Sequence, residues 1–181
     1  MKLQPDMKRN NRYRNNKTLL PNFENFIFSQ ADSPVSDLKY GRANCGIKKN
    51  GCGAVAVYNA MKLTGQPVDF CELLRELEAV KMPWLFGLFG TKPLSLGRFF
   101  RKHRAVFRKH LSLRRFQTSL RDGRCGIVCA WNKGFRGIHF YCVFYDGGNL
   151  KAMNFQYADH AVDFSFKELS VLRFIAGYVL F

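Results

Sequence analysis

The stretch KNGCGAVAVYNA, residues 49–60, places a cysteine between two glycines and follows it with small and apolar residues. Small side chains allow close packing, and the apolar residues recur at helical spacing, so we expect a buried helix over residues 53–64. Gly65 is expected to end it. Cys52 then stands at the start of this helix, either as a buried thiol that only fills space or as a nucleophile.

Further helices are expected in the first two thirds of the chain. Asp69 and Glu72 have the spacing of a capping box in front of the sequence LLRELEAV, which predicts a second helix beginning at Asp69. Residues 81–93 combine prolines and glycines with apolar side chains and predict a hydrophobic loop. Amphipathic patterns predict short helices over residues 94–103 and 113–121, with aromatic and aliphatic side chains inward and basic ones outward.

The pattern changes to strands after Gly123. Residues 125–131, 138–146 and 150–156 are rich in β-branched and aromatic residues, and the sequence DGGN between the last two favours a hairpin. A helix is expected from Ser165, with Glu168 completing a capping box, and a closing strand over the last six residues. Helices followed by an antiparallel sheet predict an α+β fold.

The chain of 181 residues is expected to form one globular domain over residues 21–181, because it is 47% hydrophobic and long enough to bury a core. Residues 1–20 are poor in apolar side chains and are expected to form a flexible basic arm. No secretory signal or spanning segment is predicted, so the expected location is cytoplasmic. The six cysteines are then expected to be free thiols, and their spacing predicts no metal site and no cofactor.

The net charge of +16 is concentrated in two segments. Residues 1–20 hold six Lys or Arg against one Asp, and residues 98–124 hold ten against one Asp. Residues 98–124 also contain interleaved phenylalanines. This pattern is compatible with binding to nucleic acid, to an anionic membrane or to an acidic peptide, and also with a plain solvated face. We favour the solvated face, followed by an acidic peptide, because no nucleic-acid-binding signature is present. Residues 98–124 are therefore a candidate site for an anionic partner.

Cysteine chemistry requires a thiolate and a base. The start of a helix favours negative charge, and Lys48 and Lys49 add positive potential near Cys52. His139, at the start of a predicted strand, is the candidate base, with a satisfied core histidine as the alternative. The other histidines are weaker candidates, because two lie in the basic segment and one follows a predicted loop: His103, His110 and His160.

A third residue is needed to orient the imidazole. If DGGN closes the hairpin symmetrically, Tyr145 pairs with Leu150, and the same register places Gln156 opposite His139. Alternation then places Asn154 on the same face as His139, on the neighbouring diagonal. A carboxamide oxygen from Asn154, or alternatively Gln156, is expected to accept the imidazole N–H.

Three stretches together resemble the papain-like cysteine peptidases, and most closely the bacteriocin-processing peptidases that cut leader peptides after a double glycine. CGAVAVYNAM (52–61) resembles the nucleophile helix, and SLRRFQTSLRDGRCGIVCAW (112–131) resembles the helix and strand before the histidine. HFYCVFYDGGNLKAMN (139–154) resembles the histidine hairpin, and the resemblance extends from Ala43 to the C-terminus.

The resemblance implies a papain-like fold and a thiol protease with a peptide or protein substrate. Cys52 would be the nucleophile, His139 the general acid and base, and Asn154 the third member of the triad. The family usually has a glutamine six residues before the cysteine, where this chain has Gly46, so Asn44 and Asn50 are the oxyanion candidates. The family favours Asp as third member, which leaves a catalytically weak or inactive module that binds a peptide or polyanion as the alternative function.

Overall fold

The computed structural model describes residues 5–41, 45–83, 91–132, 137–155, 158–169 and 173–181. These residues form a mixed α+β fold of helices and an antiparallel sheet, as the sequence predicts. Across them, no helix is both long enough and apolar enough to cross a bilayer. The α-helices are α1 (Pro5–Leu19), α2 (Ile47–Asn50), α3 (Cys52–Leu63), α4 (Phe70–Ala79), α5 (Leu96–Lys102) and α6 (Leu113–Leu120), with 3-10 turns η1 (Val35–Asp37) and η4 (Phe166–Glu168).

The main sheet has six antiparallel strands in the order β3-β8-β4-β5-β6-β7. A separate pair, β1 with β2, lies just before α2. The strands are β1 (Lys39–Tyr40), β2 (Cys45–Gly46), β3 (Phe107–His110), β4 (Cys125–Trp131), β5 (Ile138–Asp146), β6 (Asn149–Met153), β7 (Val162–Asp163) and β8 (Phe174–Leu180).

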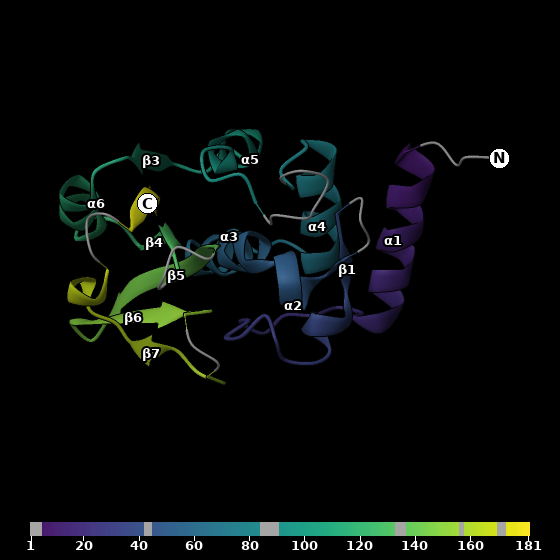
Figure 1. The fold of residues 1–181 in the computed structure, drawn as a ribbon, viewed down its shortest axis with the longest axis horizontal. Helices are drawn as coiled ribbons and strands as arrows, with labels where there is room; N and C mark the ends of the chain where they lie inside the picture. Colours follow the sequence, from purple (N-terminus) through teal and green to yellow (C-terminus); the bar gives the residue numbers. More distant parts are fainter. Residues whose placement is uncertain (1–4, 42–44, 84–90, 133–136, 156–157, 170–172) are drawn as a thin grey trace.

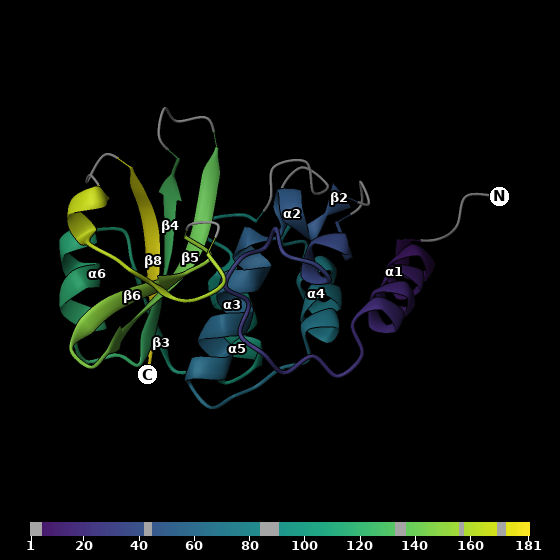
Figure 2. The same ribbon diagram turned by 90° about the horizontal axis from the view of Figure 1, so that it is seen from below.

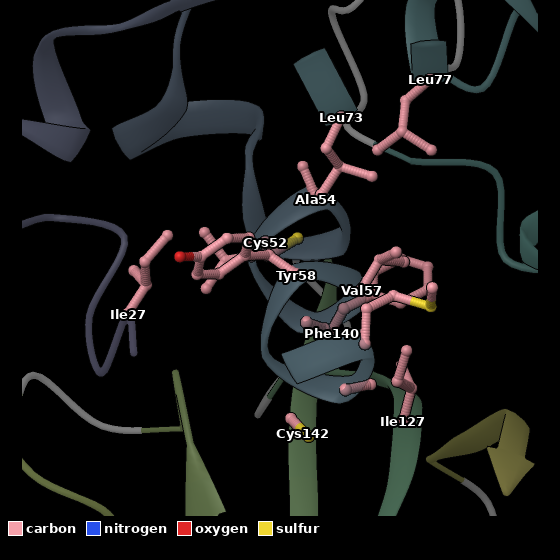
Figure 3. Packing of buried hydrophobic residues seen from close by; sticks show 14 of the residues in the cluster. Ile27, Cys52, Ala54, Val57, Tyr58, Leu73, Leu77, Ile127, Phe140 and Cys142 are labelled. Carbon is pink, nitrogen blue, oxygen red and sulfur yellow. The ribbon is translucent and has the colours of Figure 1, made fainter. Parts of the chain in front are cut away.

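Helix α3 lies between the sheet and the remaining N-terminal helices (Figures 1 and 2). One face of the sheet packs against α3, and α6 covers part of the other face. Side chains alternate between the two faces along β5, so that Phe140 and Cys142 join the α3 core while Tyr141 and Val143 join the α6 core. Figure 3 shows the apolar residues around α3.

The central helix follows the sequence prediction closely. Residues Cys52 to Met61 are all buried, which their small and apolar side chains allow. Helix α3 ends at Leu63, and Gly65, just past the C-cap residue Thr64, adopts a φ of +73°, while the N–H of Gln66 donates to the carbonyl of Met61 at 2.9 Å. This is the glycine-terminated helix end that the sequence predicts.

Three further sequence predictions are confirmed. The Asp69 side chain caps α4 by accepting from the Glu72 N–H at 2.9 Å. Helices α5 and α6 lie within the segments predicted for them, and the β5–β6 hairpin pairs Tyr145 with Leu150. Gly147 and Gly148, the two glycines of the hairpin turn, both have a positive φ. A two-residue turn with these backbone angles fixes which residues of the two strands pair.

Residues 5–19 differ from the expected flexible arm, because they form helix α1. Arg12 makes two hydrogen bonds to Glu78 on α4, at 3.1 and 2.5 Å, and Lys17 contacts Asp69 at 2.5 Å. Asn16 is buried and pairs with the backbone of Lys39 through both side-chain atoms. The helix is held by polar contacts to distant segments, which a hydrophobic pattern does not reveal.

Two other elements differ from the sequence prediction. The helix expected from Ser165 is a single 3-10 turn, in which the Ser165 side chain accepts from the Lys167 N–H. Strand β3 was not predicted, because its sequence FRKH is mostly basic and forms a strand only through pairing with β8. Most of the predicted hydrophobic loop, residues 84–90, lies outside the described residues, although its ends pair through Pro83 and Thr91.

Candidate active site

Cys52 is the first residue of α3 and follows Gly51, the N-cap residue. Its side chain is only 5% exposed and belongs to the core cluster (Figure 3). The sulfur lies beside the backbone N–H of Phe140 on β5 and beside the N–H groups of Gly53 and Cys52 itself. The thiol therefore sits at the junction between the central helix and the sheet.

The electrostatic balance at this thiol favours the neutral form. Burial raises the pKa of Cys52 to about 11, although the neighbouring N–H groups of Phe140, Gly53 and Cys52 lower it. The N–H groups at the start of the helix therefore favour the thiolate, as the sequence predicts, but desolvation outweighs their effect. In this conformation Cys52 is a thiol at neutral pH.

His139 lies near the start of β5, opposite Ala130 on β4. Its Nε2 forms a short hydrogen bond with the backbone carbonyl of Asn154. Because a carbonyl only accepts, Nε2 carries the proton and Nδ1 keeps the lone pair of the neutral ring. Burial lowers the pKa of His139, and the Asn154 carbonyl partly offsets this, so the ring is neutral at pH 7.

The sulfur and the imidazole approach the same short piece of β5 from different directions. Phe140 presents its N–H to Cys52, while the neighbouring His139 ring stacks with Tyr141 on the other face of the strand, centroids 6.1 Å apart. Among the hydrogen bonds of the described residues, none joins Cys52 Sγ to the His139 ring. The Cys52 thiol and the His139 ring therefore both lie next to the backbone of Phe140, but they are not hydrogen-bonded to each other.

Asn154 directly follows β6, whose ladder with β5 ends at Met153, and adopts a φ of +59°. Its side chain is almost fully buried and accepts from the Gln30 N–H at 3.0 Å. The amide group of Asn154 donates to Gln30 Oε1 at 3.1 Å and to the Phe140 carbonyl at 3.2 Å. The sequence predicts that this carboxamide accepts from His139, and this prediction is wrong: the backbone carbonyl of Asn154 accepts from the ring instead.

Gln30 connects the helical half of the candidate site with the sheet. Its amide group donates to the carbonyl of Lys48 on α2 at 2.8 Å, while its oxygen accepts from Asn154. The segment before it is tied to α3, because Asn59 accepts from the Ile27 N–H at 3.0 Å and donates to the Ile27 carbonyl at 2.7 Å. No local sequence signal marks Gln30, since its partners are distant in the chain.

Two buried hydroxyl groups lie close to the start of α3. A side chain on Gly53 would collide with Thr91, so Thr91 packs directly on the helix next to Cys52. The Tyr40 hydroxyl lies beside Thr91 and within electrostatic range of the thiol, and burial raises its pKa, with Glu78 and Cys52 adding to the effect. Neither hydroxyl makes a hydrogen bond of good geometry. No local pattern in the sequence marks either residue.

The structure describes one of the two oxyanion candidates. Asn50 is buried at the end of α2, two residues before Cys52. The other oxyanion candidate, Asn44, and the alternative orienting residue, Gln156, lie outside the described residues. The first N–H groups of α3 remain the donors that the described structure brings to the sulfur.

The remaining candidates do not reach the thiol. His103 bonds to Glu76 at 2.6 Å, His160 is exposed beside Asp159, and His110 contacts Phe116. Among the described residues, no three His, Cys, Asp or Glu side chains are grouped in a way that could hold a metal ion.

Comparison with known proteins leaves the family open. The sequence matches no protein-family model and no curated protein. The resemblance to papain-like peptidases therefore rests on the residues and their order in the chain.

Proposed function

We propose that the protein is a papain-like cysteine peptidase with Cys52 as nucleophile and His139 as general acid and base. The observation that carries this proposal is the hydrogen bond from His139 Nε2 to the Asn154 carbonyl, one residue from the N–H that contacts Cys52. It holds the imidazole in the tautomer whose Nδ1 accepts a proton. The peptide substrate and its leader-like character follow from the resemblance.

In the proposed reaction, the neutral ring removes the thiol proton while Sγ attacks the substrate carbonyl carbon. A bond forms between sulfur and carbon, and the N–H groups of Cys52 and Gly53 stabilise the developing oxyanion together with Asn50 or Asn44. Nδ1 then returns the proton to the departing amine as the C–N bond breaks. A water molecule gives a proton to Nδ1 and attacks the thioester carbon. The C–S bond then breaks, the acid leaves, and Nδ1 returns the proton to sulfur, which restores the thiol.

This reaction requires Nδ1 to reach Sγ around the edge of β5 at Phe140, where the Asn154 amide donates to the Phe140 carbonyl. The ladder between β5 and β6 ends at Cys142 and Met153, so no β6 backbone is paired with β5 beside Phe140. Substrate binding in the seam between α3 and β5 is the step that would bring the two groups together, and the neutral forms of both suit a base-assisted attack.

The test is hydrolysis of a mixed peptide pool, monitored by mass spectrometry with the full chain. Cleavage should occur with the wild type and disappear in Cys52→Ser and His139→Ala. Cys71→Ser is the matched control, because Cys71 is also a buried free thiol but lies on α4. Absence of cleavage by the wild type, or cleavage that survives Cys52→Ser, would reject the peptidase.

A second candidate is a catalytically inactive peptidase-like module that binds a peptide. The buried, neutral thiol of Cys52 and the absence of a bond to His139 favour it. This module would bind peptides of the pool with equal affinity in the wild type and in Cys52→Ser, and would cleave none of them.

A further inference from the structure

A strongly basic surface covers the edge of the sheet at β3 and is independent of the candidate active site. It is formed by the Lys and Arg side chains of residues 98–124, which come from α5, β3, α6 and their connections. All ten are exposed: Arg98, Arg101, Lys102, Arg104, Arg108, Lys109, Arg114, Arg115, Arg121 and Arg124. We call this set the basic surface.

The three elements of the basic surface are continuous in space. Figure 1 shows α6, β3 and α5 along one side of the molecule. Gly97 of α5 packs closely on the ring of Phe107, and α6 packs from the other side, where His110 contacts Phe116. Burial lowers the pKa of His110, and the positive charges of Arg108 on β3 and Arg115 on α6 lower it further.

Little acidic charge balances this field. Of the ion pairs among the described residues, one involves the basic surface, between Lys102 and Glu76 at 3.2 Å. Asp122 is the one acidic residue within the segment and is itself exposed. The charge is therefore available to an external anion.

Exposed aliphatic side chains accompany the charges. Val106 is 65% exposed and Leu111 is 64% exposed, and they lie directly before and directly after β3. Leu94, two residues before α5, is 55% exposed. These are three of the six exposed large hydrophobic residues among those described, and they fall within a span of eighteen residues.

The aromatic side chains of residues 98–124 differ from the basic ones, because most of them point into the protein core. Phe99, Phe100 and Phe116 are fully buried in the two cores, as the solvated-face interpretation expects. Binding to single-stranded nucleic acid relies on exposed aromatic rings that stack on bases. These three buried rings are not available for such stacking. Charges on an edge strand also prevent sheet-to-sheet association, but this role requires no exposed aliphatic residues beside them.

We propose that the basic surface binds an anionic lipid bilayer peripherally. The Lys and Arg side chains contact the headgroups, while Leu94, Val106 and Leu111 enter the boundary between headgroups and acyl chains. In Figure 2, α5 and β3 lie on the lower side of the molecule, whereas α2, which directly precedes Cys52, lies on the upper side. Membrane attachment through the basic surface would therefore not cover the start of α3.

The test is sedimentation of the full chain with vesicles of phosphatidylcholine alone and of phosphatidylcholine with about one third phosphatidylserine. Binding should require phosphatidylserine and weaken with added salt. The double variant Arg114→Glu/Arg115→Glu should weaken binding at least tenfold. The matched charge control is Lys8→Glu/Arg14→Glu, because both residues are exposed on α1 at the far end of the molecule.

The aliphatic contribution is tested separately. Val106→Ser/Leu111→Ser should weaken binding to anionic vesicles several-fold, whereas Met7→Ser/Leu19→Ser, two exposed apolar residues of α1, should not. Equal sedimentation with both vesicle types, or none with either, would overturn the proposal. So would binding to a DNA duplex that is tighter than to vesicles and insensitive to Val106→Ser/Leu111→Ser, since that result assigns the surface to nucleic acid.

Discussion

The ring of His139 is held by the backbone carbonyl of Asn154, while the Asn154 carboxamide is occupied by Gln30 and Phe140. In the arrangement that the sequence suggests, the side chain orients the imidazole. Here the conformation of residue 154 matters more than the chemistry of its side chain, because only its backbone reaches the ring.

Glycine should therefore replace Asn154 better than alanine. The residue has a φ of +59°, which glycine adopts freely and which costs alanine about 1–2 kcal/mol. We expect Asn154→Gly to retain more peptide cleavage than Asn154→Ala, and to retain the Nε2–H tautomer of His139 in nitrogen-15 NMR spectra. Equal loss in both variants would show that the carboxamide orients the ring.

Alkylation of Cys52 should increase with pH. Burial raises its pKa to about 11, so the reactive thiolate fraction should grow about tenfold per pH unit from pH 6 to 9. The rate is measured with iodoacetamide and mass spectrometry in a Cys45→Ser background, because Cys45 is the one cysteine among the described residues that is not buried. A rate that is constant between pH 5 and 8 would instead indicate a thiolate paired with protonated His139.

The segment before Gln30 should depend on Asn59. This side chain is fully buried and makes both a donor and an acceptor bond to Ile27, so Asn59→Ala leaves two backbone groups unsatisfied. We expect the free energy of unfolding in urea to fall by about 2–4 kcal/mol. Asn25→Ala is the control, because Asn25 is exposed in the same segment and should change stability by less than about 0.5 kcal/mol. Equal effects would contradict the anchoring role.

Helix α1 should be held chiefly by Arg12. Its side chain and that of Glu78 are 13% and 8% exposed, and Glu78 also accepts from the Gly41 N–H at 2.7 Å. Arg12→Ala leaves a largely buried carboxylate without its cation and should destabilise the protein by about 2–4 kcal/mol. Lys17→Ala removes a more exposed pair with Asp69 and should cost less than about 1 kcal/mol. Urea unfolding of both variants checks this order, and a larger loss from Lys17→Ala would refute it.

Local signals in the sequence predicted the elements that position the candidate site. The DGGN turn set the pairing of Tyr145 with Leu150, and the capping residue Asp69 marked the start of α4. The small residues after Cys52 identified the buried helix. Each of these signals acts between neighbours in the chain, so no knowledge of the rest of the fold was needed.

The sequence by itself therefore determined the α+β order, the central helix and the hairpin. Only the tertiary structure decided that the backbone of Phe140 lies beside Cys52, that Asn154 bonds to His139 through its backbone carbonyl, and that α1 packs against α4. The physical reason is distance along the chain. These contacts join residues far apart in sequence, and their geometry depends on how the elements pack and on the burial that this packing imposes on each polar group.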